Sequence, residues 1–147
     1  MKVYDTRAVR NVAFVGHSAS GKTSLVDALA FVAGSSRRHG MIGDGTTLTD
    51  YTPDEIERKH SIGLGIGFAE WMDTKLNLID APGYLDFLGE TTTALHTADA
   101  AVVVVGAVGG VEVGTEKAWE ICDHLHLTVV LADVASEKLD LSDVVLG

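Results

Sequence analysis

Two spacings of apolar residues alternate along the chain, and they predict strands and helices in turn. Nearly continuous apolar runs are typical of buried strands, and they occur at residues 11–15, 76–79, 100–105 and 128–132. A period of two across residues 61–71 predicts one more strand, and the pair Asp73 and Thr74 predicts a hairpin turn after it. Apolar residues at helical spacing predict helices at residues 22–33, 89–97 and 115–125.

Strands that alternate with helices predict an α/β fold in which a mostly parallel sheet is covered on both faces. Gly34 is the expected C-cap of the first helix, and Thr115 is the expected N-cap of the last. Residues 35–60 are polar and rich in Gly, Thr and Asp. We expect them to form a mobile loop, and a loop of this length within a compact domain usually either has a function or is disordered.

Composition narrows the class of protein. The chain has 147 residues, of which 46% are apolar and 22% charged, as is typical of one globular domain. Its net charge of −10 disfavours direct, sequence-specific nucleic-acid binding. A single cysteine excludes an intrachain disulfide and suits a reducing compartment, so we expect a cytoplasmic protein. The apolar runs are too short to span a bilayer, and no membrane partner is expected.

The first candidate site follows the strand at residues 11–15. Residues 16–23 read GHSASGKT and match the phosphate-loop pattern G-x-x-x-x-G-K-[ST] at every fixed position. Such a loop turns backbone N–H groups toward phosphate oxygens, and the following helix adds its positive dipole end. Lys22 would neutralise the β- and γ-phosphates, and the Thr23 hydroxyl would bind Mg²⁺. The alternative is a chance match in a glycine-rich turn, which the strand before it and the helix after it disfavour. The predicted nucleotide-binding residues are Gly16, His17, Ser18, Ala19, Ser20, Gly21, Lys22, Thr23 and Ser24.

A second candidate motif, D-x-x-G, follows the strand at residues 76–79. Asp80 at the strand tip is placed to hold Mg²⁺ through a water, and Gly83 to present its N–H to a γ-phosphate. Alone the motif is weak, because Asp and Gly are common in turns. Ser61 would complete the Mg²⁺ shell, although its position alone does not distinguish it from a solvated serine. The predicted metal ligands are Thr23, Ser61 and Asp80.

Cys122, His124 and His126 form a C-x-H-x-H run that suggests zinc at first sight. Residues two apart on a helix point in different directions, so these three side chains would not converge on one ion. We therefore expect packing and surface roles for them.

Four stretches together resemble the N-terminal part of the GTPase domain of elongation factor G, and most of all its "elongation factor G-like" paralogues. They are RNVAFVGHSASGKTS (10–24), GTTLTDYTP (45–53), DAPGYLDFLG (80–89) and DAAVVVVGAVGGVEVGTEKAW (99–119). The resemblance implies a phosphate-loop, translation-factor GTPase fold that binds GTP or GDP with Mg²⁺. It implies that residues 1–147 are an incomplete GTP-binding domain, truncated at its C-terminal edge, and that the ribosome is a partner of the full-length form. It places Ser61 on the Mg²⁺-binding threonine of the first switch, and Asp80 and Gly83 on the second switch.

The chain departs from this family at three places. Serine replaces the first-switch threonine at Ser61, which retains the hydroxyl. Tyr84 stands where the family has the histidine that positions the attacking water, and tyrosine does not become a cation at neutral pH. The guanine-reading N-K-x-D motif is altered to EKLD at residues 137–140, which leaves Asp140, or less readily Asp133, to read the base.

These departures lead to a prediction of GTP binding with slow hydrolysis, in which Lys22, Gly83 and Tyr84 are the catalytic candidates. Two alternatives stay open: a non-hydrolysing switch that senses GTP or GDP, and an ATPase with degraded base recognition.

Overall fold

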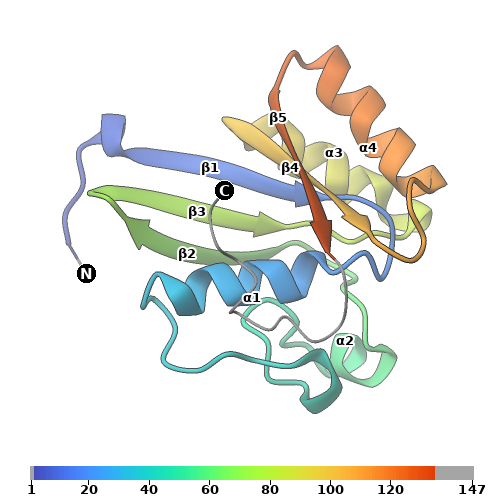
Figure 1. Cartoon of the computed structure of the whole chain (residues 1–147), viewed down its shortest axis with the longest axis horizontal. Coiled ribbons are helices and arrows are strands. Elements are labelled where there is room, and N and C mark those ends of the chain that lie inside the picture. Colours follow the sequence, from blue (N-terminus) through green and yellow to red (C-terminus); the bar gives the residue numbers. More distant parts are fainter. Residues whose placement is uncertain (1, 135–147) are drawn as a thin grey trace.

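The computed structural model describes residues 2–134 of the chain. Within these residues the centre of the fold is a five-stranded sheet in the order β2-β3-β1-β4-β5 (Figure 1). Strands β1, β3, β4 and β5 run parallel, and β2 is antiparallel to β3. The mostly parallel α/β sheet expected from the sequence is therefore confirmed. The strands are β1 (Val9–Val15), β2 (Gly65–Trp71), β3 (Thr74–Asp80), β4 (Ala100–Gly106) and β5 (Thr128–Val134).

Helices cover both faces of the sheet, because successive residues of each strand point to opposite sides. On β1, Phe14 packs with α1, whereas Ala13 and Val15 pack with α3 and α4 on the other face. Figure 1 shows α1 on one side of the sheet and the pair α3 and α4 on the other. No helix in this described part of the chain is long and apolar enough to cross a membrane. The α-helices are α1 (Lys22–Val32), α2 (Pro53–Arg58), α3 (Leu88–Thr97) and α4 (Val113–His124), and the 3-10 turns are η1 (Thr6–Ala8), η2 (Ile42–Asp44) and η3 (Leu85–Phe87).

A two-residue turn joins β2 to β3, which confirms the predicted hairpin. Met72 and Asp73 form the turn, and both have positive φ, at 47° and 59°. Positive φ at both central residues defines the type I′ turn, whose twist matches that of the paired strands.

The structure corrects the expectation for residues 35–60. They are not a loop throughout, because they contain η2 and the helix α2, and their expected mobility stays a prediction. Thr52 caps α2: its side chain accepts from the Glu55 N–H, the Glu55 side chain reaches back to Thr52, and Pro53 opens the helix. The strand expected from residue 61 also starts later, at Gly65, since residues 61–64 leave the sheet to reach the site.

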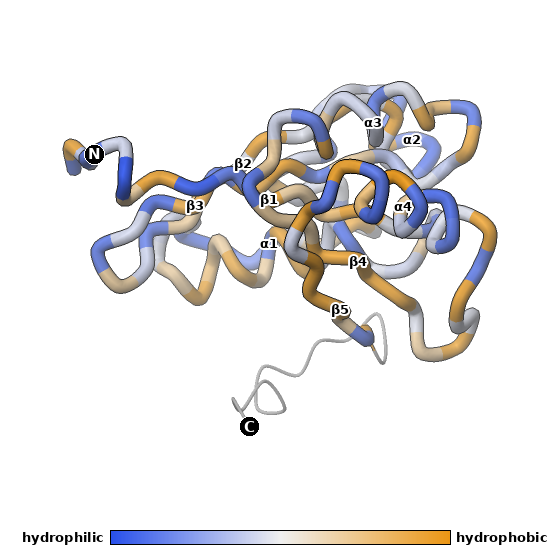
Figure 2. The backbone as a smooth tube through the Cα atoms, turned by 90° about the horizontal axis from the view of Figure 1, so that it is seen from above, coloured by the Kyte–Doolittle hydropathy of each residue, from blue (hydrophilic) through white to orange (hydrophobic). Residues whose placement is uncertain are grey.

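Two further expectations need correction. Glu112 is the N-cap of α4, and Thr115 is the third helical residue, whose side chain completes a capping box with Glu112. The run at 128–132 does form β5, but four of the seven residues of β5 are exposed. β5 is the last strand of the described sheet, so part of its apolar colour in Figure 2 lies on the surface, whereas Val129, Ala132 and Val134 pack against the core. Gly34 has φ of 74° just after the Ala33 C-cap of α1, close to its expected place.

Candidate functional site

The phosphate-loop residues connect β1 to α1 at the edge where the parallel strands end. Gly21 is the N-cap of α1 with φ of 95°, a left-handed conformation that glycine adopts without strain. Among the described residues no side chain caps this helix end. The first N–H groups of α1 are therefore available to an anion, in addition to the positive end of the helix dipole.

Lys22 is buried beneath the loop, with a relative exposure of 5%. Its Nζ donates to the His17 carbonyl oxygen at 2.6 Å. Burial lowers the pKa of Lys22 to about 8, against the opposing charges of Asp80 and Asp50. An ammonium group held in such a desolvated position is stabilised by a bound anion.

Hydroxyl and carboxylate groups from four segments meet beside Lys22. Thr23 and Thr49 each donate an Oγ1 hydrogen bond of 2.7 Å to Asp80 Oδ2. The Ser61 Oγ lies 3.2 Å from Thr23 Oγ1 and donates to Asp50 Oδ1 at 2.6 Å. The structure thus brings together all three predicted metal ligands.

Asp80 is the most buried carboxylate of this cluster, with a relative exposure of 1%. Its Oδ1 has no hydrogen-bond partner within residues 2–134. Burial raises the pKa of Asp80 to about 6, although hydrogen bonds from Thr49 and Thr23 and the charge of Lys22 lower it. Burial also raises the pKa of Asp50. A buried carboxylate oxygen without a partner, beside hydroxyl groups, has the hard oxygen chemistry that Mg²⁺ prefers.

Gly83 packs directly on the phosphate loop. A Cβ atom at this position would lie 2.6 Å from the Ser18 nitrogen and would also meet Lys22 Nζ. Only glycine therefore allows the second-switch backbone to approach the loop this closely. On the far side of the loop, Gly114 of α4 donates its N–H to His17 Nδ1 at 3.2 Å.

A hollow of about 120 Å³ lies between the phosphate loop and the turn after α2. Lys22, Thr23 and Tyr84 line it, whereas Asp80 and Gly83 are not among its lining residues. The other predicted residues that line it are Ser18, Ala19, Gly21 and Ser61. Ser24 lies in the first turn of α1 and is not among the lining residues, and Asp140 lies outside the described residues.

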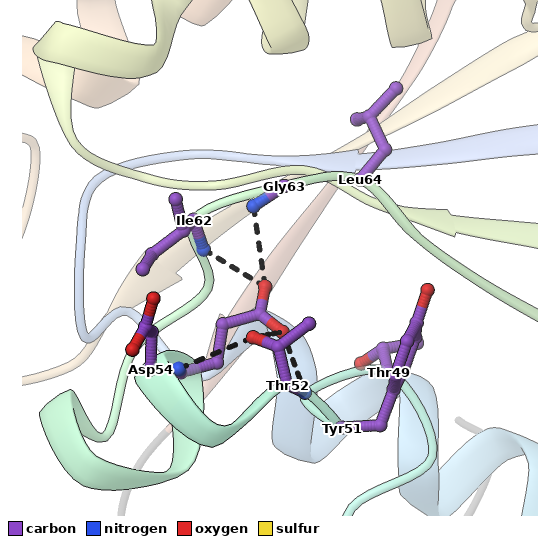
Figure 3. Close-up of a pocket in the computed structure, with 8 residues that line it drawn as sticks. Thr49, Tyr51, Thr52, Asp54, Ile62, Gly63 and Leu64 are labelled. Carbon is purple, nitrogen blue, oxygen red and sulfur yellow. Dashed lines mark hydrogen bonds between the residues drawn. The ribbon is translucent and has the colours of Figure 1, made fainter.

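A larger hollow of about 290 Å³ lies beside α2, and Figure 3 shows the side chains around it. Glu55 Oε1 accepts from the N–H groups of Ile62 and Gly63 at 3.1 and 3.2 Å, and Glu55 Oε2 accepts from Thr52. Burial raises the pKa of Glu55, but these hydrogen bonds outweigh burial and leave the pKa lowered. The Glu55 carboxylate therefore ties residues 61–63, and Ser61 with them, to α2.

Sequence reasoning missed three residues that shape the site: Asp27, Thr49 and Asp50. Asp27 of α1 accepts backbone hydrogen bonds from Gly40 and Leu48, and so holds the segment that carries Thr49 and Asp50. Thr49 and Asp50 lie in a Thr- and Asp-rich stretch at 46–50, which is equally typical of turns, and the resemblance over 45–53 assigned neither residue a role. Cys122 is fully buried in the core between the sheet and α3 and α4, so it has a packing role.

A parallel sheet with a glycine-rich loop between β1 and α1, a buried lysine and an aspartate at the end of β3 defines a phosphate-loop nucleotide-binding domain. The chain belongs to the elongation factor Tu GTP-binding domain family, whose model matches residues 7–143. It is 40% identical over 119 residues to an elongation factor G-like protein of Mycobacterium tuberculosis, covering 81% of this chain and 17% of the relative.

Two other comparisons agree. The mitochondrial ribosome-releasing factor 2 of Debaryomyces hansenii is 40% identical over 118 residues, covering 80% of this chain and 14% of that protein. A protein of known crystal structure from Thermus thermophilus is 44% identical with a TM-score of 0.80, covering 84% of this chain and 19% of that one. The chain therefore spans less than a fifth of the length of each of these proteins.

Proposed function

We propose that the chain binds GTP and GDP together with Mg²⁺ and hydrolyses GTP slowly. The observation that carries the proposal is that Lys22, Thr23 and Ser61 line one hollow beside the free N-terminus of α1, and that Asp80 accepts a hydrogen bond from Thr23 next to it. Lys22 and the loop amides would bind the phosphates, and Gly83 would donate its N–H to the γ-phosphate. Phosphoryl transfer requires mainly such positioning and charge neutralisation.

The residues present fit Mg²⁺. Thr23 and Ser61 would ligate it through their hydroxyl groups, and the Asp80 carboxylate would hold it, directly or through a water, with its unpartnered Oδ1. When bound, Mg²⁺ would neutralise the charge of the β- and γ-phosphates. We expect nucleotide affinity to fall when the metal is chelated, and Ser61→Ala to reduce the difference between the Mg²⁺ and chelator conditions.

The slow rate follows from Tyr84, which occupies the position after Gly83 that holds a histidine in the family that the sequence resembles. Acid–base and positioning groups contribute about 10²–10⁴-fold to enzyme rates, so the replacement lowers the expected turnover. We propose the ribosome as the partner of a full-length form, because a relative at 40% identity is named a ribosome-releasing factor.

A nucleotide titration tests the binding. Lys22→Ala should weaken GTP binding by about 3–5 kcal/mol, on the scale of removing one partner of a buried charge pair. Lys117→Ala is the matched control, because Lys117 is an exposed lysine of α4 that pairs with Glu120. Unchanged GTP and GDP affinity in a folded Lys22→Ala variant would overturn the assignment. A wild-type chain that binds GTP but releases no phosphate in single-turnover assays would leave the non-hydrolysing switch as the function.

A further inference from the structure

His60 lies at the turn between α2 and the buried Ser61. α2 ends at Arg58, and Lys59 follows it as the C-cap with φ of 57°, a left-handed conformation that costs a non-glycine residue about 1–2 kcal/mol. The turn reverses the chain and places His60 on the wall of the same hollow that Lys22 and Thr23 line. Strained turns that aim a side chain into a site are typical of functional positions.

The hydrogen bonding of the His60 ring defines which nitrogen carries a proton in the neutral form. Nδ1 lies 3.0 Å from the carbonyl oxygen of Arg58. A carbonyl oxygen only accepts hydrogen bonds, so Nδ1 is the donor of this pair. In the neutral ring Nε2 therefore has its lone pair free to accept a hydrogen bond.

The His60 ring packs against Tyr84, which directly follows Gly83 and also lines the hollow. The two ring centroids are 4.6 Å apart and the ring planes are inclined by 55°. At this separation an aromatic pair contributes a favourable interaction in addition to the burial of apolar area. Tyr84 is 44% exposed, and its ring packs on that of His60.

We propose that His60 supplies the hydrogen-bond acceptor that orients the attacking water, and that Tyr84 holds the His60 ring in place. The inference rests on the proposed GTP hydrolysis. In the reaction the water oxygen forms a bond to the γ-phosphorus, and the bond from that phosphorus to the β–γ bridging oxygen breaks with its electron pair left on GDP. One proton of the water passes to a γ-phosphate oxygen, which gives inorganic phosphate. His60 aligns the water through Nε2 and is unchanged.

The test measures single-turnover GTP hydrolysis and the affinity for GTP and GDP in the same variants of this chain. His60→Ala should lower the hydrolysis rate about tenfold. This loss is smaller than the 10²–10⁴-fold contribution of such groups, because phosphate binding and charge neutralisation persist in the variant. The affinities should stay within about twofold, since Lys22 and the loop are intact. His60→Gln retains an acceptor at similar reach and should recover much of the rate. Tyr84→Ala should also lower the rate, because it removes the ring against which His60 packs. His96→Ala, on the exposed face of α3, is the control.

Equal hydrolysis rates for wild type and His60→Ala would overturn the role of His60 and leave the proposed hydrolysis standing. Equal losses of rate in His60→Ala and His60→Gln would also overturn it, because they would indicate a packing role. A wild-type chain that binds GTP but does not hydrolyse it would overturn the proposed hydrolysis, and with it the role of His60. Because GTP binding is measured separately, this result is distinguishable from one in which wild type and His60→Ala hydrolyse GTP equally.

Discussion

Lys22 and Asp80 show how the site departs from ordinary packing at the level of single residues. Both are almost fully buried, and burial moves their pKa values toward neutrality from opposite sides, to about 8 and about 6. Each charged form is destabilised by the loss of water. Ligands that supply the missing charges, an anionic phosphate and a cation, would relieve both. The burial of Lys22 and Asp80 thus lowers the stability of the ligand-free fold and preorganises the two groups for binding.

The free-energy cost of burying the charged form of Lys22 predicts how the stability of the fold depends on pH. The pKa of Lys22 falls from 10.5 in the unfolded chain to about 8 in the folded one. Between these values the unfolded chain binds the additional proton, so the free energy of unfolding rises with pH across about 8 to 10.5. The shift corresponds to about 3 kcal/mol at most. Urea unfolding of the nucleotide-free chain at several pH values measures it.

Lys22→Met is the matched variant, since methionine fills a similar volume without a titrating group. Relative to wild type, Lys22→Met should be more stable near pH 7, and the difference should shrink as pH rises above 8. A constant difference across this range would contradict the assigned burial cost.

At the scale of elements, Asp27 links α1 to the segment before α2. Its side chain is 2% exposed, and its two oxygens accept the N–H groups of Gly40 and Leu48, the latter at 2.9 Å. Because Leu48 precedes Thr49 and Asp50, the carboxylate of Asp27 positions the part of residues 35–60 that reaches Asp80.

Asp27→Ala should release this segment. We expect faster amide exchange at Gly40 and Leu48, by about tenfold if the two lost hydrogen bonds contribute roughly 1.4 kcal/mol to local stability. Exchange on α3 should not change. A GTP analogue with Mg²⁺ should protect residues 35–60 in wild type and protect them less in Asp27→Ala. Equal protection of this segment with and without the analogue in wild type would exclude a nucleotide-dependent switch.

The hairpin turn offers a second test at this scale, away from the site. Met72 holds φ of 47° and its side chain is 84% exposed, so it has backbone strain and little packing to lose. Met72→Asn should stabilise the chain by about 0.5–1 kcal/mol, because asparagine accepts the left-handed conformation of a type I′ turn. Thermal unfolding measures the gain. Met72→Val, a β-branched residue that resists positive φ, should instead destabilise the turn.

At the scale of the whole molecule, the end of β5 lies beside the phosphate loop. The side chain of Val134 approaches Gly21 so closely that a Cβ on Gly21 would lie 2.9 Å from Val134 Cγ1. Val134, which precedes residues 137–140 in the sequence, therefore lies against the phosphate loop. Asp133, the less favoured candidate for reading guanine, is exposed in β5. Asp140, the preferred candidate, stays a prediction.

Residues 137–140 read EKLD, where the family that the sequence resembles has N-K-x-D. Without the asparagine, a carboxylate that reads guanine would lack a supporting group. We expect the chain to prefer GTP over ATP by less than about a thousandfold, or roughly 4 kcal/mol. Competition of ATP and GTP for a fluorescent nucleotide measures the ratio. A larger preference would show that another group reads the base.

The sequence by itself determined the alternation of strands and helices and the phosphate loop. Both follow from local rules: apolar spacing selects the element, and the glycines and Lys22 lie within one short segment between a strand and a helix. It also placed Asp80 at the end of a strand, because the apolar pattern of that strand is clear, whereas the roles of Asp80 and Gly83 stay predictions. Residues 35–60 have no regular spacing of apolar residues, so the sequence did not predict α2 or its capping box.

Only the tertiary structure decided which distant residues complete the site. Thr49 and Asp80 are 31 positions apart, and Thr23 and Ser61 are 38 apart, yet their side chains meet. The contact between His60 and Tyr84 and the anchoring by Asp27 are of the same kind. Burial on β5 also depended on the structure, since an apolar run predicts a strand but not whether another element covers it. Such pairings depend on how the elements pack in three dimensions, and the spacing of residues along the chain does not encode them.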